Sequence, residues 1–346
     1  MSIASAGRPT LASIAELTGV STPTVSKVVN GRDDVAPDTR AKVLAALQEA
    51  GYESPGMRRL NNGAAVVNVT FDSIASSYST TVLAGILDYA ASADVEVLLT
   101  ATGGLPGVTL DFGRMAQRMV DEDRAGLIVV TPAFTESHLV AFRRRRIPVV
   151  VIDPLNAPPA DVVSVGATNW AGGKAAAEHL LDLGHQRIAY LGGPEAAECN
   201  VARLHGYMAA LMARGVQVNP DFILHGKFRA EHGEAGLTAL LSLPERPTAI
   251  FAGNDAIGVG VLREARRRGI HVPEDLSLVG FDGTALADDS VPAMTSVEQP
   301  LHDMGRMALR TILRQAQGER IESHRVELAT QLVIRESTAA PPFPVR

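Results

Sequence analysis

The sequence predicts an N-terminal all-α helix-turn-helix head followed by an α/β body of two doubly wound parallel-sheet lobes. Three observations predict this fold class. The first fifty of the 346 residues contain three short helical patterns. From residue 64 short apolar runs alternate with amphipathic helices, which is typical of parallel sheets covered on both faces. Residues 183–194 (LGHQRIAYLGGP) begin that alternation anew, so we expect two lobes with a cleft between them.

The helices of the head are predicted from caps and apolar spacing. Thr10 is the expected N-cap of a first helix, in which Ile14 and Leu17 lie one turn apart on the apolar side. Gly19 is free to adopt the positive φ of a tight turn, and Ser21 is the expected cap of the second helix. The third helix is expected to begin at Pro37, to end before Gly51 and to carry apolar Val43, Leu44 and Leu47.

The second helix has a polar outer face. Val25, Val28 and Val29 recur at helical spacing and should face inward. The residues left on the outer side are Thr22, Pro23, Ser26, Lys27 and Asn30. A helix, a glycine-containing turn and a second helix with a polar face form the arrangement in which the second helix enters the major groove of DNA. A small helical bundle that binds nothing is the alternative that this pattern leaves open.

Composition and charge limit the class of protein. With 46% hydrophobic and 20% charged residues, the chain is expected to be soluble and globular, without a membrane partner. It has no secretory signal pattern and a single cysteine, Cys199, so we expect a cytoplasmic location. The nine histidines lack metal-ligand spacing, and no metal or cofactor is expected. Residues 1–63 carry seven Lys/Arg against six Asp/Glu, so DNA binding would depend on where these few cations lie.

The body is predicted element by element. Residues 53–63 contain Pro, Gly and Asn and are expected to form a linker. Strands are expected at 66–71, 95–100, 126–130, 148–152, 188–191, 249–252 and 276–281. Helices are expected between them, among others at 80–93, 172–183, 201–214 and 256–268.

Several motifs resemble the lactose-repressor family. They are residues 10–21 (TLASIAELTGVS), 24–31 (TVSKVVNG), 184–189 (GHQRIA), 272–282 (VPEDLSLVGFD) and 332–338 (LVIREST). The resemblance covers nearly the whole chain. It implies a transcriptional regulator with lobes of periplasmic-binding-protein type, acting as a homodimer on pseudo-palindromic operator DNA. It also implies that an effector bound in the cleft changes the affinity for DNA.

This resemblance implies a division of the chain. The DNA-binding domain is expected at 1–52, the hinge at 53–63 and the effector-binding and dimerisation domain at 64–338. Within that domain, the first lobe is expected at about 64–167 and 297–323, and the second lobe at about 168–296 and 324–338. A tail is expected at 339–346, and its lack of leucine heptads favours a dimer over a tetramer joined by a coiled coil.

The resemblance also assigns DNA contacts. Thr22, Pro23 and Lys27 occupy base-reading positions, although a phosphate contact of Lys27 remains open. The positions expected to provide caps and phosphate contacts are Thr10, Ser21, Thr24 and Asn30, and Ser26 lies on the same face. Arg58 and Leu60 match the end of a hinge helix whose leucine wedges into the minor groove. Two departures are Ala36, where the family has a capping serine, and a segment 52–60 that is one residue short.

Polar residues after predicted strands indicate an effector site. Asp153, Asn254 and Asp282 follow strands, Arg203 lies near the start of a helix, and all four match effector positions of the family. Asp255, next to Asn254, is expected to be the N-cap of the following helix and not a ligand of the effector. Carboxylates, an amide and a guanidinium suit the vicinal hydroxyls of a sugar, either a mono- or an oligosaccharide. The aromatic residues expected to stack on the sugar, or else to pack in the core, are Tyr78, Trp170 and Phe228. Release of DNA by the sugar is the expected mode, and corepression or a protein co-effector is the alternative.

The sequence argues against two other classes of protein. An enzyme is disfavoured because the sequence has neither a G-x-x-x-x-G-K-[ST] phosphate loop nor a G-x-S-x-G nucleophile elbow. A sugar-binding protein without DNA function is disfavoured by the helical head.

Overall fold

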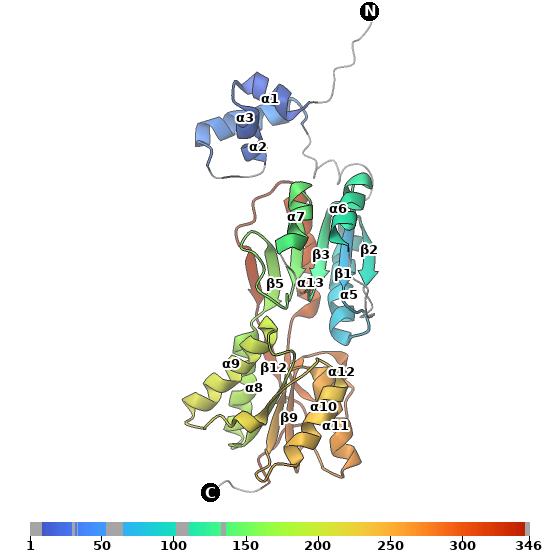
Figure 1. Cartoon of the computed structure of the whole chain (residues 1–346), viewed down its shortest axis with the longest axis vertical. Helices are drawn as coiled ribbons and strands as arrows, with labels where there is room; N and C mark the ends of the chain where they lie inside the picture. The colour runs from blue at the N-terminus through green and yellow to red at the C-terminus, as the bar shows by residue number, and fades with distance from the viewer. Residues whose placement is uncertain are drawn as a thin grey trace, which may run out of the picture.

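The computed structural model of the chain describes residues 9–29, 32, 34–52, 65–101, 111–132 and 136–342. Figure 1 shows three bodies in a row: the helical head, a first lobe below it and a second lobe that carries the C-terminal end. This arrangement agrees with the predicted fold class of a helical head and two sheet-containing lobes.

Three helices form the head: α1 (Leu11–Thr18), α2 (Thr22–Val29) and α3 (Pro37–Glu49). Thr10 caps α1 through a reciprocal pair of hydrogen bonds with Ser13, and Gly19 ends α1 at φ 65°. The core of the head consists of Ile14, Ala15, Val25, Val28, Val35, Val43 and Leu47. Leu17 and Leu44 were expected on the apolar, inward side of their helices, and this prediction is wrong: they are 70% and 50% exposed. The three short helices enclose a core too small to cover every apolar residue on them.

A parallel six-stranded sheet forms the first lobe, in the order β11-β5-β4-β3-β1-β2. Its strands are β1 (Ala65–Phe71), β2 (Val95–Ala101), β3 (Gly126–Val130), β4 (Val149–Ile152), β5 (Val163–Ala167) and β11 (Arg325–Leu328). One face is covered by α5 (Ser77–Ser92) and α13 (Leu301–Ala316). The other is covered by α6 (Phe112–Asp121) and α7 (Glu136–Arg144). Both faces are buried, as the apolar strand sequences predict.

The second lobe has a six-stranded sheet in the order β12-β10-β9-β8-β6-β7, with β12 antiparallel to β10. Its strands are β6 (Ile188–Gly192), β7 (Ile223–His225), β8 (Ala249–Ala252), β9 (Ser277–Asp282), β10 (Thr295–Glu298) and β12 (Gln331–Val333). One face is covered by α8 (Asn169–Asp182) and α9 (Glu198–Ala213). The other is covered by α10 (Ala230–Leu241) and α11 (Asp255–Arg267), and the short elements are η1 (Pro220–Phe222) and α12 (Ala285–Asp288).

The chain passes three times between the lobes: after β5, after β10 and after β11. Two of these crossings are joined, because Thr330 N donates to Thr168 Oγ1 at 2.9 Å and Thr168 N donates to the Leu328 carbonyl at 2.9 Å. The sequence division placed two of the crossings after residues 296 and 323. Both come later in the structure, because β10 still belongs to the second sheet and β11 to the first. Short, partly exposed strands such as β11 carry little apolar signal in the sequence.

Helices α5, α8 and α9 each begin three residues earlier than the apolar pattern predicts. Apart from Tyr78 and Trp170, the first turns of these helices contain polar or small residues, so they show no apolar periodicity. Among the residues described, no helix has the length and apolar character needed to cross a membrane, and no cluster of three or more His, Cys, Asp or Glu could hold a metal ion.

Candidate functional site

The cleft side of the first lobe presents Tyr78 and Asp153. Tyr78 lies in the first turn of α5, and its hydroxyl donates to Asp153 Oδ2 at 2.6 Å. Asp153 directly follows β4, is 7% exposed and has a φ of 42°. A positive φ is rare for a residue with a side chain and is maintained only where the surroundings enforce it, often at functional sites. The two predicted residues are thus joined at one position beyond the sheet.

Arg203 is the centre of the polar network of the second lobe. It is 3% exposed on α9, and its Nη1 donates to the Gly253 carbonyl at 2.6 Å. The same nitrogen lies 3.5 Å from Asp282 Oδ1, and Nε donates to Asn169 Oδ1 at 2.8 Å. The guanidinium carbon is 3.8 Å from the ring centre of Phe281. A buried guanidinium held by a carboxylate, an amide, a carbonyl and an aromatic face has a fixed orientation.

Asp282 ends β9 and resembles Asp153 in its backbone. Its φ is 104°, it is 5% exposed, and Gln299 Nε2 donates to its Oδ1 at 2.7 Å. Burial raises the pKa of Asp282 to about 7, although the nearby Arg203 acts in the opposite direction. Burial also raises the pKa of Asp153, again against the charge of Arg203. Arg203 therefore acts electrostatically on a carboxyl from each lobe, which brings three predicted residues into one network.

Asn254 has a role that the sequence analysis gave to its neighbour. Its Oδ1 accepts from Ile257 N at 2.9 Å, so Asn254 is the N-cap of α11. Asp255, read from the sequence as the cap, is 1% exposed and accepts from Thr284 N at 2.7 Å and Ser296 Oγ at 2.6 Å. Burial raises the pKa of Asp255 to about 6. The amide nitrogen of Asn254 is the part of this side chain that is not used in capping.

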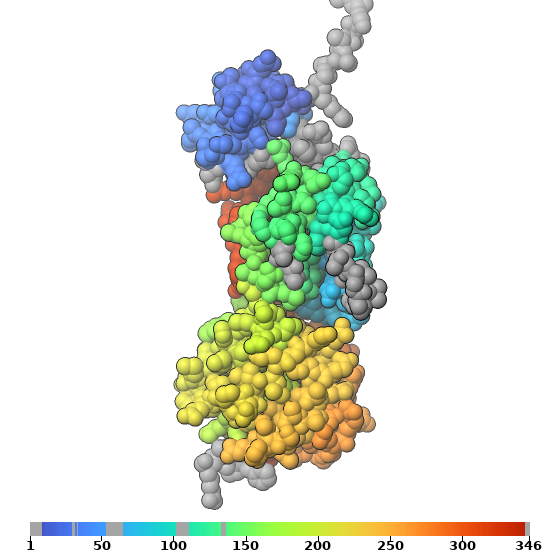
Figure 2. All heavy atoms as spheres, viewed as in Figure 1, coloured from blue at the N-terminus to red at the C-terminus, as the bar shows by residue number. Residues whose placement is uncertain are grey.

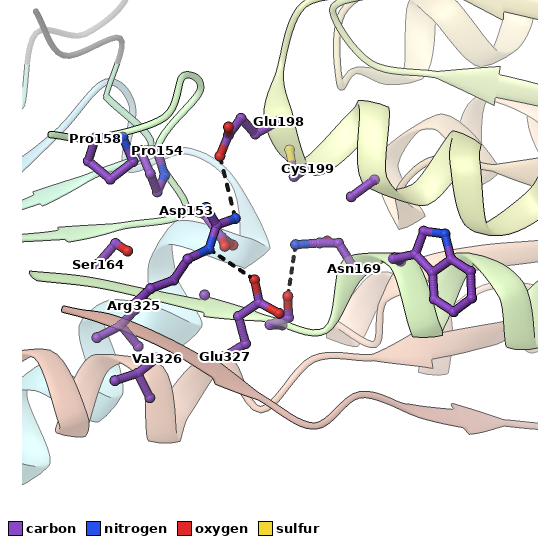
Figure 3. A pocket seen from close by; sticks show the side chains of 15 residues that line it. Asp153, Pro154, Pro158, Ser164, Asn169, Glu198, Cys199, Arg325, Val326 and Glu327 are labelled. Carbon is purple, nitrogen blue, oxygen red and sulfur yellow. Dashed lines mark hydrogen bonds and ion pairs between the residues drawn. The ribbon is translucent and has the colours of Figure 1, made fainter. Parts of the chain in front are cut away.

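A hollow of about 100 Å³ lies beside Asp153 and is lined from both lobes (Figure 3). Arg325 of β11 lies between Glu327 on its own strand and Glu198 of α9, at 3.2 and 3.6 Å. Glu198 N also donates to the Leu155 carbonyl at 3.1 Å. These contacts connect the two lobes at the edge of the cleft.

The predicted stacking residues lie at different depths. Trp170 is 47% exposed and lines the hollow that contains Asp153. Phe228 is half-buried, with its ring centre 5.8 Å from the guanidinium carbon of Arg203. Tyr78 is half-buried as well, and burial raises its pKa well above the usual value. Phe228 thus lies beside Arg203, and Tyr78 is bonded to Asp153. Trp170 lies at the margin of the network.

Two members of the network were missed by the sequence analysis. Asn169 holds Arg203, and Gln299 holds Asp282. Both follow a strand by two residues or fewer, β5 and β10 respectively. The rule that selected Asp153 would have found them if these two strands had been recognised.

In the head, Ser21 directly precedes α2. Its Oγ accepts from Thr24 N at 3.3 Å and lies 2.8 Å from Thr24 Oγ1, as expected for a capping residue. Thr22 and Pro23 are exposed in the first turn of α2, and Thr24 is half-buried. Ser21 therefore caps α2 while the side chains of Thr22 and Pro23 in its first turn stay exposed to solvent.

Further along α2, Lys27 pairs with Asp34 at 2.5 Å, and this ion pair lowers the pKa of Asp34. Ser26 Oγ accepts from Arg146 of the first lobe at 3.3 Å. Ala36 provides no side-chain cap to α3. The predicted contacts Asn30, Arg58 and Leu60 lie outside the described residues.

A helix-turn-helix head joined to two lobes around a buried polar network defines a ligand-responsive DNA-binding regulator. Comparison with known proteins gives the family. Residues 10–54 match the profile "Bacterial regulatory proteins, lacI family", and residues 177–338 match "Periplasmic binding protein-like domain". The chain is 34% identical over 339 residues to the HTH-type transcriptional regulator CelR of Thermobifida fusca, covering 95% of this chain and 98% of that protein. The chain therefore belongs to the lacI family.

Two solved structures cover nearly the whole chain. A CelR–cellobiose complex has a TM-score of 0.71 and 31% identity, covering 95% of this chain and 100% of the other. A lac repressor dimer bound to operator and the anti-inducer ONPF has a TM-score of 0.70 and 26% identity, covering 96% and 99%. These similarities extend over the head and both lobes, so the family assignment applies to the complete arrangement.

Proposed function

We propose that the chain is a repressor that binds a pseudo-palindromic operator and is released by a sugar bound between its lobes. The observation that carries this proposal is the buried network of Asp153, Arg203 and Asp282, in which an arginine of one lobe acts on a carboxyl of each. A ligand that exchanges hydrogen bonds with both carboxyls changes how the lobes meet, because it binds one lobe arrangement better than another. Binding, and not catalysis, is the proposed role of the cleft.

The proposed class of ligand follows from the donors and acceptors of the network. Carboxylates accept hydrogen bonds from hydroxyls, while the guanidinium of Arg203 donates to ring or hydroxyl oxygens. Phe228 and Tyr78 supply aromatic surface beside these groups. The relative CelR was solved with cellobiose, which supports a mono- or oligosaccharide. Corepression by the sugar is the second candidate, and it differs only in which lobe arrangement holds DNA.

The experiment is a titration of the full chain with mono- and oligosaccharides, cellobiose among them, followed by the thermal midpoint. A sugar that binds only the folded protein increases the free energy of unfolding and therefore raises the thermal midpoint. At a sugar concentration a hundredfold above Kd the increase is about 2.7 kcal/mol. Arg203→Lys keeps the charge and loses the planar fork, so it should abolish the shift. Arg214→Lys, at the exposed end of α9, is the matched control and should keep the shift. The sugar-sensor proposal fails if no member of the panel changes the midpoint.

The DNA contacts proposed for the head are Thr22, Pro23 and Lys27 as base readers, and Thr10, Ser21, Thr24, Ser26 and Asn30 as capping or phosphate-contacting residues. Arg58 and Leu60 are proposed to act in the minor groove, from a hinge at residues 53–63. Lys27 must give up its ion pair with Asp34 to reach DNA. Selection of duplexes from a random library by the full chain tests this half: an enriched pseudo-palindrome is expected, and Lys27→Ala should change the enriched bases.

A homodimer is proposed from apolar side chains on one edge of the first lobe. Strand β2 is an edge strand, and its Leu98 and Leu99 are 41% and 39% exposed. Leu87 of the adjacent helix α5 is 47% exposed. Exposed apolar residues on an edge strand favour burial against a second chain. A dimer matches two half-sites of an operator, and a cytoplasmic location follows from the proposed binding to operator DNA.

A further inference from the structure

Four consecutive arginines, residues 143–146, occupy the last two positions of α7 and the two positions that follow it. Neither the head nor the effector network explains this run. Arg143 is neutralised by ion pairs with Glu136 and Asp161. Arg145 donates to Gln117 Oε1 at 3.0 Å. These two arginines are therefore held within the lobe.

Arg144 and Arg146 differ from the other two. Both are exposed, and among the described residues neither forms an ion pair with a carboxylate. Arg146 Nη2 donates to Ser26 Oγ of α2 at 3.3 Å, across 120 residues of sequence. On the end of the first lobe that borders the head there are thus two cations that have no carboxylate partner within the described part of the chain.

Figures 1 and 2 show this end of α7 directly below the head. The head ends at residue 52 and the first strand begins at residue 65, so twelve residues connect them. A chain of that length spans at most about 40 Å when fully extended. Residue 52 of the head therefore stays within about 40 Å of the first residue of β1, so the head cannot carry bound DNA far from the first lobe.

The head has few cations of its own for this task. Residues 1–63 carry seven Lys/Arg against six Asp/Glu, the whole chain has a net charge of −6, and Lys27 is paired with Asp34. Affinity for DNA depends on how many phosphates are neutralised, so cations from another part of the chain would add directly to it.

We propose that Arg144 and Arg146 of the first lobe bind phosphates of the DNA backbone beside the site held by the head. This proposal rests on the proposed function, since it requires that the head binds DNA. The contact is sequence-independent: it adds affinity and positions the lobe on the duplex without reading bases. On binding DNA, Arg146 exchanges Ser26 for a phosphate.

The test measures the affinity of the full chain for a 40-base-pair duplex of mixed sequence at several salt concentrations. The variant is Arg144→Gln together with Arg146→Gln. The matched control is Arg263→Gln together with Arg266→Gln, two exposed arginines of α11 in the second lobe, far from the head. In B-DNA each lost phosphate contact reduces the slope of log K against log salt by about 0.9, so the variant should lose about 1.8 per protomer. The control should keep the wild-type slope, and both should keep the wild-type thermal midpoint.

Three results would overturn the proposal. The first is a wild-type slope in the double variant, which would leave the run as a stabiliser of the helix end alone. The second is tighter DNA binding with an unchanged slope, which would make Arg146 a clasp that holds the head away from DNA. The third is a wild-type chain that fails to bind the duplex even at low salt. The proposed function fails separately, if the wild-type chain binds this duplex but enriches no sequence from a random library.

Discussion

Substitution of Gly173 by alanine should displace the helix that carries Arg203. Gly173 lies on α8, where α8 packs against α9. A Cβ added at Gly173 would lie 2.3 Å from the Arg203 carbonyl oxygen and 2.8 Å from its Cα. Contacts between Cβ and other heavy atoms are ordinarily 3.4 Å or longer. The two backbones would therefore have to separate by about 1 Å, because neither obstructing atom belongs to a flexible side chain.

The magnitude follows from this overlap. Overpacking of a filled interior costs about 1–3 kcal/mol, which corresponds to roughly 3–10 °C in the thermal midpoint of a lobe of this size. The same displacement moves Arg203, whose Nη1 bond to the Gly253 carbonyl is 2.6 Å long. A shift of about 1 Å takes this bond beyond hydrogen-bonding distance, so sugar affinity should fall at least tenfold.

Thermal unfolding by circular dichroism and sugar titration by calorimetry measure the two effects. Gly113→Ala is the control, because Gly113 is exposed in the first turn of α6 and its added Cβ meets only the side chain of Asp111, at 3.3 Å. Alanine there should change the stability by less than about 1 kcal/mol, since its Cβ meets no backbone atom and glycine is the weaker helix former. If Gly173→Ala unfolds at the wild-type temperature and binds sugar with wild-type affinity, the close approach of α8 and α9 does not position Arg203.

Three further predictions concern pH and assembly. Burial lowers the pKa of His185, so the unfolded chain takes up a proton at higher pH than the folded protein. Stability should therefore be full above about pH 6.5 and fall as the pH decreases below it. In His185→Gln the thermal midpoint should fall less steeply as the pH decreases, whereas the exposed control His271→Gln should behave like the wild type. If both variants show the same dependence of the midpoint on pH, His185 is not the group responsible. Burial raises the pKa of Asp282 to about 7, so it gains a proton between pH 8 and pH 6. The sugar affinity of the wild type, measured by calorimetry, should fall several-fold as the pH decreases over that range. An affinity that does not change with pH there would show that Asp282 is not in the site. Leu87→Asp with Leu98→Asp should convert a dimer to a monomer in sedimentation, whereas an intact dimer would place the interface elsewhere.

Helix and strand periods in the sequence were sufficient for most of the fold. The runs at β1, β3, β4, β6, β8 and β9 are apolar because these strands are buried on both faces. Strands β11 and β12 are short and partly exposed, so their sequences contain no comparable run. The pairing of β11 with β5 joins residues about 160 positions apart, and local sequence patterns carry no signal for such a contact.

Most residues of the candidate site were predicted from the sequence, but the hydrogen bonds between them were not. Asp153 and Asp282 follow strands, and the rule that ligands bind beyond strand ends found them. Arg203 was placed in the site by resemblance. The exchange of roles between Asn254 and Asp255 was not predictable, because either residue can cap a helix. Which one caps depends on Thr284 and Ser296, which hold the Asp255 carboxyl in the interior.

The sequence by itself determined the class of fold, the caps of the head and the polar residues at the strand ends, because each depends on residues within a few positions of one another. The tertiary structure alone decided that Tyr78 bonds Asp153, that Gln299 bonds Asp282, and that Arg146 reaches Ser26 of the head. These pairs are separated by up to 120 residues, and the distances and burial that set their energies exist only after the lobes have folded.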